Sequence, residues 1–325
     1  MKCLSLMVLT AFALAATGVA RCDAETIRIA AQKTGTFAWE LAVIRAHGLD
    51  RQSNLSIEAV ELASPEAGKI ALRSGNADII ISDWLWVSRE RSLGAGLTFY
   101  PYSSAVGAVM VAGASTLNSL ADLRGRTLAV AGGPIDKSWL LLRAALKQDG
   151  IDLKAEANIV YGAPPLLTAK ALSGETDATL NYWNFCAALE ARGFRRLAGI
   201  ADILPKLGAS GDTAMIGYVF DEAWANAHQE LVGRFIATTR RAKEMLASSD
   251  QEWESIKSLT GATDAATLRA YRDRYREGIV RRPVAADEAD AKALYRVLAA
   301  IGGRDLVGSA TELEPGTFYR AAPKD

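Results

Sequence analysis

The chain repeats itself, and this repeat limits its possible folds more than any other feature. Residues 71–84 read ALRSGNADIIISDW, and residues 171–183 read ALSGETDATLNYW. Both contain Ala-Leu, Ser-Gly, an Asp, an apolar run and a Trp in the same order. The repeat extends upstream, because residues 27–50 and 127–152 both read as an apolar strand, a glycine-containing loop, a Trp and an apolar-periodic helix. The sequence therefore predicts two similar halves.

Each half has the strand–helix–strand–helix–strand order that is typical of a parallel sheet with crossover helices, so we expect an α/β fold. Residues 55–75 and 157–174 supply the middle strand, a turn containing proline and the second helix of each half. The Gly-x-x-Asp stretches at residues 75–78 and 174–177 are interpreted as structural corners, in which glycine ends a helix, and not as catalytic carboxylates.

Two further strand-like segments, residues 97–112 and 213–220, are interpreted as passages of the chain between two lobes. We expect the chain to leave the first lobe near Val111 and to return near Tyr218. From Asp221 onward the pattern is helical, and this C-terminal tail is expected to pack on the first lobe. The expected boundaries are residues 25–111 with 219–325 for the first lobe and residues 112–218 for the second.

Ligands of parallel α/β sheets bind beyond the carboxyl ends of the strands, so both lobes are expected to present these ends to one shared site. Thr36 and Ser138 lie where the first helix of each half begins, and free N–H groups at such helix ends favour an anionic group. Two lysines and two aspartates lie nearby: Lys33, Lys137, Asp83 and Asp136. The aspartates would pair with the lysines or bind a cationic ligand. The charge of the ligand stays open, with a preference for an anionic or zwitterionic solute.

Aromatic residues gather at the same strand ends, as a stacking pocket would require. Trp39 and Trp139 lie inside helices and are expected in the core, whereas Trp84 and Tyr182 follow strand ends directly and are the favoured ligand contacts. The predicted ligand-binding residues are Thr36, Phe37, Trp39, Asp83, Trp84, Gly133, Asp136, Ser138, Tyr182 and Trp183.

Residues 1–24 have the charged start, short apolar run and small residues of a secretory signal peptide. Cleavage after Ala20 or after Ala24 would leave a small residue at the cut. The apolar run is shorter than the roughly 20 residues that a membrane-spanning helix needs. We therefore expect an exported, soluble protein.

The remaining composition argues against several classes of function. Lys+Arg and Asp+Glu are equal at 37 each, so no charge excess points to nucleic acid. If Cys3 and Cys22 leave with the signal peptide, Cys186 remains alone, which excludes an intramolecular disulfide, a metal cluster and a redox pair. His47 and His228 are expected at the surface, and no motif of a nucleophilic or phosphate-binding enzyme is present. We predict no catalytic residues, no metal and no cofactor.

Three stretches resemble a known family: residues 120–133 (LADLRGRTLAVAGG), residues 170–183 (KALSGETDATLNYW) and residues 44–62 (IRAHGLDRQSNLSIEAVEL). They are similar to the periplasmic solute-binding proteins of ABC importers, in the class that binds nitrate, sulfonates, taurine and thiamine-pyrimidine precursors. The resemblance covers essentially the whole chain after the signal peptide.

The resemblance implies a two-lobed periplasmic-binding-protein fold of type II with a hinge of two crossing strands. It also implies a monomer in the periplasm that captures a small solute and delivers it to an ABC permease with its ATPase. A periplasmic sensor for a membrane receptor would use the same fold and stays open as an alternative. A pyrimidine-synthase-like enzyme is disfavoured, because it would need reactive His and Cys chemistry. No motif identifies the substrate.

Overall fold

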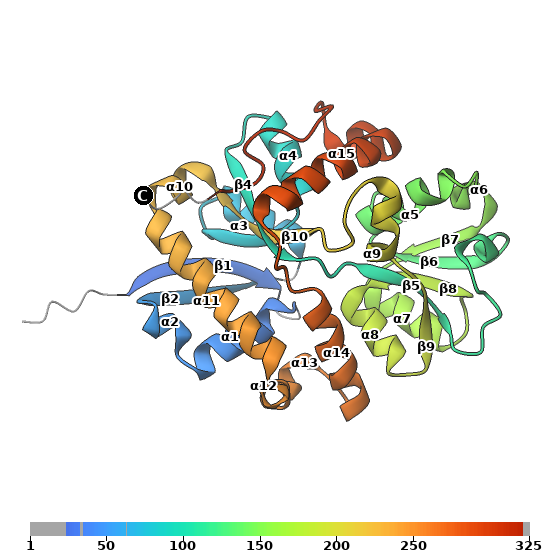
Figure 1. Cartoon of the computed structure of the whole chain (residues 1–325), viewed down its shortest axis with the longest axis horizontal. Coiled ribbons are helices and arrows are strands. Elements are labelled where there is room, and N and C mark those ends of the chain that lie inside the picture. Colours follow the sequence, from blue (N-terminus) through green and yellow to red (C-terminus); the bar gives the residue numbers. More distant parts are fainter. Residues whose placement is uncertain (1–23, 33–34, 63, 321–325) are drawn as a thin grey trace, which may run out of the picture.

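The computed structural model describes residues 24–32, 35–62 and 64–320 of the chain. The predicted signal peptide, with Cys3 and Cys22, and the predicted site lysine Lys33 lie outside the described residues. The described chain forms two lobes side by side, each built on a five-stranded sheet (Figure 1).

The two sheets have the same construction, which confirms the α/β fold with two similar halves. In each sheet the three strands at one side run parallel to one another. At the other side lie two more strands, and the one next to the parallel set runs antiparallel to it. The first sheet has the order β2 (Leu55–Leu62), β1 (Glu25–Gln32), β3 (Ile79–Ser82), β10 (Ile216–Asp221), β4 (Leu97–Ser103). The second has the order β7 (Asn158–Gly162), β6 (Thr127–Ala131), β8 (Ala178–Tyr182), β5 (Gly107–Ala112), β9 (Phe194–Gly199).

Helices cover both faces of each sheet (Figure 1). Those of the first lobe are α1 (Phe37–Ala46), α2 (Leu49–Gln52), α3 (Pro65–Arg73), α4 (Trp84–Ser92), α10 (Glu222–Ala227), α11 (Gln229–Ser248), α12 (Asp250–Ser255) and α13 (Lys257–Thr260). Those of the second lobe are the 3-10 turn η1 (Leu120–Leu123), α5 (Lys137–Lys147), α6 (Leu153–Glu156), α7 (Pro164–Leu172), α8 (Trp183–Glu190), α9 (Ile200–Ile203) and η2 (Leu204–Leu207). The chain ends with α14 (Ala265–Glu277) and α15 (Val284–Val307).

The repeated phrase has the same structural role in both lobes. Gly75 and Gly174 follow α3 and α7 with positive φ angles of 71° and 76°, a conformation that glycine adopts without strain. The carboxylate of Asp78 then accepts the N–H of Arg28 on β1 at 2.8 Å, and that of Asp177 accepts the N–H of Thr127 on β6 at 2.8 Å. These aspartates therefore join the third strand of each half to the first, as structural corners.

The passages between the lobes differ from the expectation. Val111 pairs with Arg195 in the second sheet, so the chain has already left the first sheet at residues 104–106, between β4 and β5. Tyr218 pairs with Tyr100 in the first sheet, so the return lies before β10, at residues 208–215. The single strand read across residues 97–112 is in fact two strands, one in each sheet.

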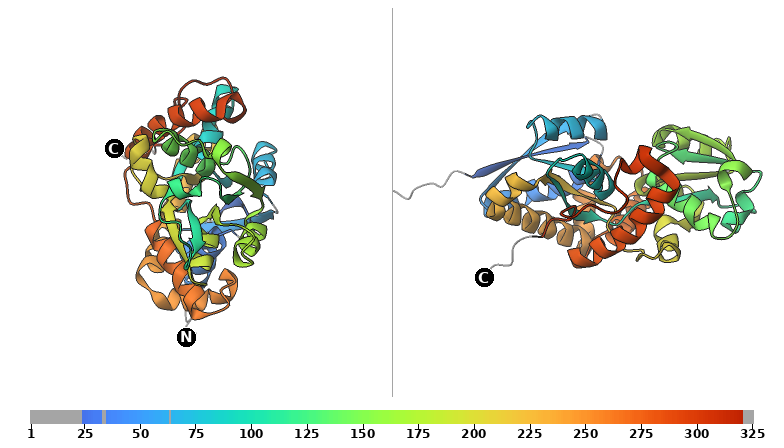
Figure 2. Two further views of the ribbon diagram at one scale, coloured as in Figure 1. Left: turned by 90° about the vertical axis from the view of Figure 1, so that its right-hand side faces the viewer. Right: turned by 90° about the horizontal axis from the view of Figure 1, so that it is seen from above.

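The C-terminal tail contacts both lobes. α15 contacts α4 and β4 of the first lobe and α5 of the second, and it lies over the junction of the lobes (Figure 2). α14 contacts α11 and α12 of the first lobe and α8 of the second. The tail also binds both passages. The N–H of Ser104 donates to Gly278 at 3.0 Å, and the N–H of Ala214 donates to Asp287 at 3.1 Å.

Candidate functional site

The facing strand ends of the two lobes are joined by an ion pair. Asp83 follows β3 in the first lobe and caps α4, where its carboxylate accepts the N–H of Trp86 at 2.9 Å. Lys137, the first residue of α5 in the second lobe, places its Nζ 2.9 Å from Oδ2 of Asp83. Of the two roles considered for Asp83, the structure therefore shows pairing with a lysine.

Burial and the neighbouring charges shift the pKa values of this pair in opposite directions, and the effect of the charges is larger. Burial raises the pKa of Asp83, but the charge and hydrogen bond of Lys137 and the Trp86 N–H outweigh it, so the pKa lies below its usual value. Burial lowers the pKa of Lys137, but the charges of Asp83 and Asp136 outweigh it and leave the pKa raised. The pair is therefore ionic at neutral pH.

Asp136 and Tyr182 form a second contact, within the second lobe. Oδ1 of Asp136 accepts the N–H groups of Ser138 and Trp139 and thereby caps α5. Its Oδ2 accepts the hydroxyl of Tyr182 at 3.3 Å, and burial raises the pKa of Asp136. Gly132 lies against this contact with φ of 91°, and a Cβ there would stand 2.8 Å from both Oδ2 of Asp136 and the hydroxyl of Tyr182. Tyr182 is 36% exposed and remains accessible to a ligand.

Trp84, one of the two favoured ligand contacts, is in the core instead. Its side chain is 0% exposed, and its indole N–H donates to the carbonyl of Ala214 at 3.1 Å. As the first residue of α4, it turns beneath the helix toward the second passage of the chain. Trp84 therefore fixes that passage and presents no surface to a ligand.

The other predicted residues fall into three groups. Phe37, Trp39 and Ser138 are buried, and Phe37 packs edge-on against Tyr102 and Tyr218. Gly133 lies in the loop before α5 with φ of 144°. Thr36 and Trp183 come together from different lobes in a small pocket, which we call the Lys243 pocket. It is lined by Thr36, Tyr102, Ser103, Ala105, Trp183, Lys243, Tyr275, Gly278 and Ile279.

A buried carboxylate holds the ammonium group of this pocket. Oε1 of Glu40 accepts three hydrogen bonds of 2.6 Å, from Nζ of Lys243 and from the hydroxyls of Tyr102 and Tyr275. Glu40 is 0% exposed, whereas the side chain of Lys243 is 12% exposed and reaches the pocket wall. Nζ of Lys243 also lies 3.5 Å from the centroid of the Tyr102 ring.

Burial lowers the pKa of Lys243, and the charge of Glu40 opposes this shift. The sequence did not reveal this lysine, because residues 229–248 read as an ordinary amphipathic helix with a polar face. Glu40 lies 203 residues earlier, and only the folded chain brings the two together.

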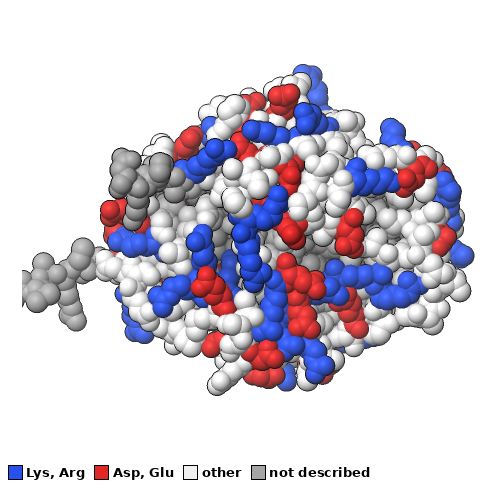
Figure 3. Space-filling model, in the orientation of Figure 1, with Lys and Arg blue, Asp and Glu red and all other residues white. Residues whose placement is uncertain are grey.

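Among residues 24–32, 35–62 and 64–320, no group of His, Cys, Asp and Glu could hold a metal ion, and no helix is long and apolar enough to cross a membrane. Cys186 is buried, and burial raises the pKa of its thiol to about 12. His47 and His228 are exposed, as expected. On the face shown in Figure 3, positive and negative side chains are interspersed without a large area of one sign.

Comparison with known proteins gives a family and a fold. A family model described as NMT1/THI5 like matches residues 41–252. No curated protein matches the chain.

Several solved structures share the fold. The aliphatic sulphonate-binding protein SsuA from Escherichia coli matches with a TM-score of 0.74 and 19% identity, over 93% of this chain and 94% of that one. The alkanesulfonate-binding protein SsuA from Xanthomonas axonopodis pv. citri, bound to MOPS, matches with a TM-score of 0.63 and 21% identity, over 87% and 96% of the two chains. The desulfurization enzyme DSZB matches with a TM-score of 0.56 and 14% identity, over 86% and 92%. At these identities the likeness shows the two-lobed fold alone.

Proposed function

We propose that this chain, which belongs to the NMT1/THI5-like family, is the solute-binding component of an ABC importer. It captures a small polar organic solute, anionic or zwitterionic, between its two lobes and delivers it to a membrane permease with its ATPase. The predicted signal peptide and the family resemblance support a periplasmic location and a monomeric state.

The observation that carries this proposal is the composition of the Lys243 pocket. Trp183 comes from the second lobe, and Thr36, Tyr102 and Lys243 come from the first. The cavity is small, about 10 Å³, so only a small group of the solute would enter it, and there it would touch both lobes. Such a solute binds the closed arrangement better than the open one, and this difference in affinity would drive closure.

The chemistry of the same pocket favours an anionic group. Nζ of Lys243 donates one hydrogen bond to Glu40, which leaves two of its three N–H bonds for a ligand. Thr36 adds a hydroxyl where α1, a helix of 10 residues, begins, and the positive end of the helix dipole also attracts an anion. The half-buried ring of Trp183 is available to the apolar part of the solute, whereas a face of the Tyr102 ring is already covered by Nζ of Lys243.

The aspartates that would have answered a cationic ligand already have partners. Asp83 is bonded to Lys137, and Asp136 accepts two backbone N–H groups and the hydroxyl of Tyr182. This leaves the anionic alternative as the better supported one.

No observation on the described residues favours the sensor or the enzyme reading over import. Cys186 is buried, both histidines are exposed, and none of the three lines the pocket. A gene for a permease or for a sensor kinase beside this one would separate import from sensing.

The test is calorimetric titration with MOPS, taurine and nitrate, after native mass spectrometry of the gently purified protein to weigh any bound solute. The key variant is Glu40→Gln with Lys243→Met, because it removes both buried charges and leaves no uncompensated one. The matched control is Lys170→Met, which removes a half-buried lysine of α7 that pairs with Glu175.

We expect binding of at least one anionic solute that the double variant loses and the control keeps. A loss of roughly tenfold or more corresponds to one charge-assisted hydrogen bond. Equal affinity in all three proteins would place the solute outside the Lys243 pocket. If no solute binds and none copurifies, the solute-binding proposal itself fails.

A further inference from the structure

Helix α14 belongs to the core of the first lobe although it lies between the lobes. Its residues Leu268 and Tyr275 are buried in the same apolar cluster as Ile27 of β1. Arg272 and Arg276 both bind the carboxylate of Asp250 in α12, at 2.7 and 2.8 Å. α14 is therefore fixed to the first lobe by apolar burial and by two ion pairs.

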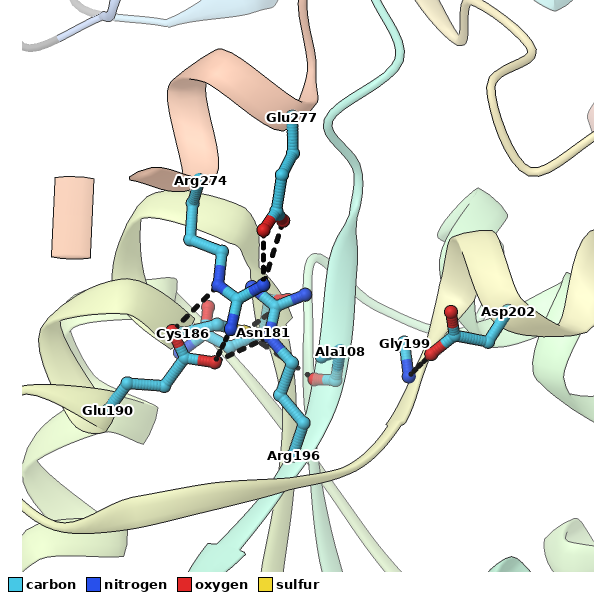
Figure 4. Close-up of polar contacts among 9 residues, drawn as sticks. All are labelled: Ala108, Asn181, Cys186, Glu190, Arg196, Gly199, Asp202, Arg274 and Glu277. Atoms are coloured by element: carbon cyan, nitrogen blue, oxygen red, sulfur yellow. Dashed lines mark hydrogen bonds and ion pairs between the residues drawn. The ribbon is translucent and has the colours of Figure 1, made fainter. Parts of the chain in front are cut away.

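The contact of α14 with α8 of the second lobe includes charged groups. The carboxylate of Glu190, at the end of α8, lies between two guanidinium groups (Figure 4). Arg274 of α14 binds both of its oxygens, at 2.9 and 3.0 Å, and Arg196 of β9 binds Oε1 at 2.6 Å. Arg274 also binds Glu277 one turn further along α14. We call Glu190, Arg196 and Arg274 the interlobe clasp.

The clasp lies beside both passages of the chain. A second pocket is lined by residues 104–106 of the first passage, by Gly211 and Asp212 of the second, and by Arg196, Arg274 and Glu277, among others. Because α14 is anchored to the first lobe, a rotation of the lobes about these passages moves Arg274 away from Glu190. Charged groups on both sides of this contact regain water when it parts, so the contact can form and break reversibly.

An aromatic residue of α8 also contacts the first lobe on this flank. Trp183, the first residue of α8, packs edge-on against Trp39 at a centroid distance of 5.9 Å and lies 6.4 Å from Tyr275. The clasp holds the far end of the same helix. It therefore sets where Trp183 stands in the wall of the Lys243 pocket.

We propose that the interlobe clasp keeps the two lobes closed in the absence of solute. The proposal rests on the solute-binding function and adds how that site is regulated: a solute meets a protein that is already partly closed. The bidentate bond and the half-buried carboxylate, 17% exposed, make the clasp stronger than an ordinary surface pair.

The test is small-angle X-ray scattering of the whole protein, freed of any bound solute by unfolding and refolding, with each curve fitted as a mixture of closed and open molecules. Glu190→Gln removes the charge of the clasp with little change of shape. The matched control is Glu175→Gln, which breaks the ion pair with Lys170 inside the second lobe.

We expect the wild-type protein to contain a substantial closed fraction without solute. Glu190→Gln should raise the ratio of open to closed molecules roughly fivefold, and the control should leave it unchanged. Arg274→Gln should act in the same direction. So should 1 M salt on the wild type, because the Debye length then falls to about 3 Å and the ion pair is screened. These two serve as independent measurements if the first variant unfolds.

Two results would overturn the clasp: a wild-type protein that is fully open without solute, or a closed fraction that Glu190→Gln, Arg274→Gln and salt all leave unaltered. Neither result depends on whether a solute is found. Conversely, if MOPS and the other solutes fail to bind while the scattering responds as expected, the clasp stands and the solute-binding function fails. If the clasp and the solute-binding function are both confirmed, Glu190→Gln should weaken solute affinity by a factor no larger than the factor by which it lowers the closed fraction.

Discussion

Replacing Trp84 by Ala should destabilise the fold and should not act first on ligand binding. The side chain is 0% exposed, so the substitution leaves a large cavity under α4. Truncation of a buried aromatic side chain of this size costs about 3–5 kcal/mol. The carbonyl of Ala214 also loses its indole donor, which adds about 1–3 kcal/mol if it finds no water. Against a total stability of about 5–15 kcal/mol, this is a large loss.

Urea unfolding followed by circular dichroism measures the loss of stability. Two further variants separate the contributions of packing, of the hydrogen bond and of ligand contact. Trp84→Phe keeps most of the apolar volume and loses the hydrogen bond to Ala214, so it should cost about 1–3 kcal/mol. Trp183→Ala, which removes a half-buried ring from the Lys243 pocket, should change the unfolding midpoint less and abolish binding of the solute found by titration. If Trp84→Ala unfolds at the wild-type midpoint but no longer binds solute, Trp84 is a ligand contact after all and the burial argument is refuted.

Three more predictions follow from single residues. The pKa of Asp83 is lowered in the folded state. Its ionised carboxylate therefore stabilises the fold at pH values above the unfolded pKa of about 3.9, and this effect is lost as the pH falls through the folded pKa. Asp83→Asn should cost stability at pH 7, and its difference from the wild type in acid unfolding should vanish at the lowest pH. The pKa of the Cys186 thiol is raised to about 12, so the thiol should not react with a thiol reagent at pH 8 until urea unfolds the chain. Rapid labelling of the folded protein would contradict this expectation. Cys186→Ser should bind solute as the wild type does. Gly132→Ala should lower the melting temperature, because a Cβ would meet Tyr182 and Asp136 at 2.8 Å and the φ angle of 91° is unfavourable; an unchanged melting temperature would mean that the loop relaxes freely.

The sequence predicted the parallel half of each sheet because the repeat carries local signals. Gly75 and Gly174 end helices, and the aspartates that follow them join the third strand of each half to the first, so the succession of three strands could be read twice. The first passage was misplaced because residues 97–112 were read as one strand on their β-branched and aromatic residues, although Pro101, Ser104 and Gly107 interrupt that run. Only pairing with different sheets divides them at residues 104–106.

The candidate site was predicted less well, for two physical reasons. A residue directly after a strand was expected to face the ligand, but the first residue of a helix can also turn inward. Trp84 turns inward and Tyr182 does not. The second reason is distance along the chain. Glu40 and Lys243 both read as polar positions of amphipathic helices, and their contact depends on how the C-terminal tail packs on α1.

The position of β10 has a consequence for the order in which the chain acquires its structure. The second sheet is built from one continuous stretch, from β5 to β9, and can form as soon as that stretch has been synthesised. The first sheet cannot, because β10 lies between β3 and β4 and follows them only after the whole second lobe. Contacts between segments so far apart in the sequence form slowly. The two halves therefore share one architecture but have different folding histories: the half that is made first is completed last, and until then β3 and β4 carry open edges that a neighbouring chain could pair with.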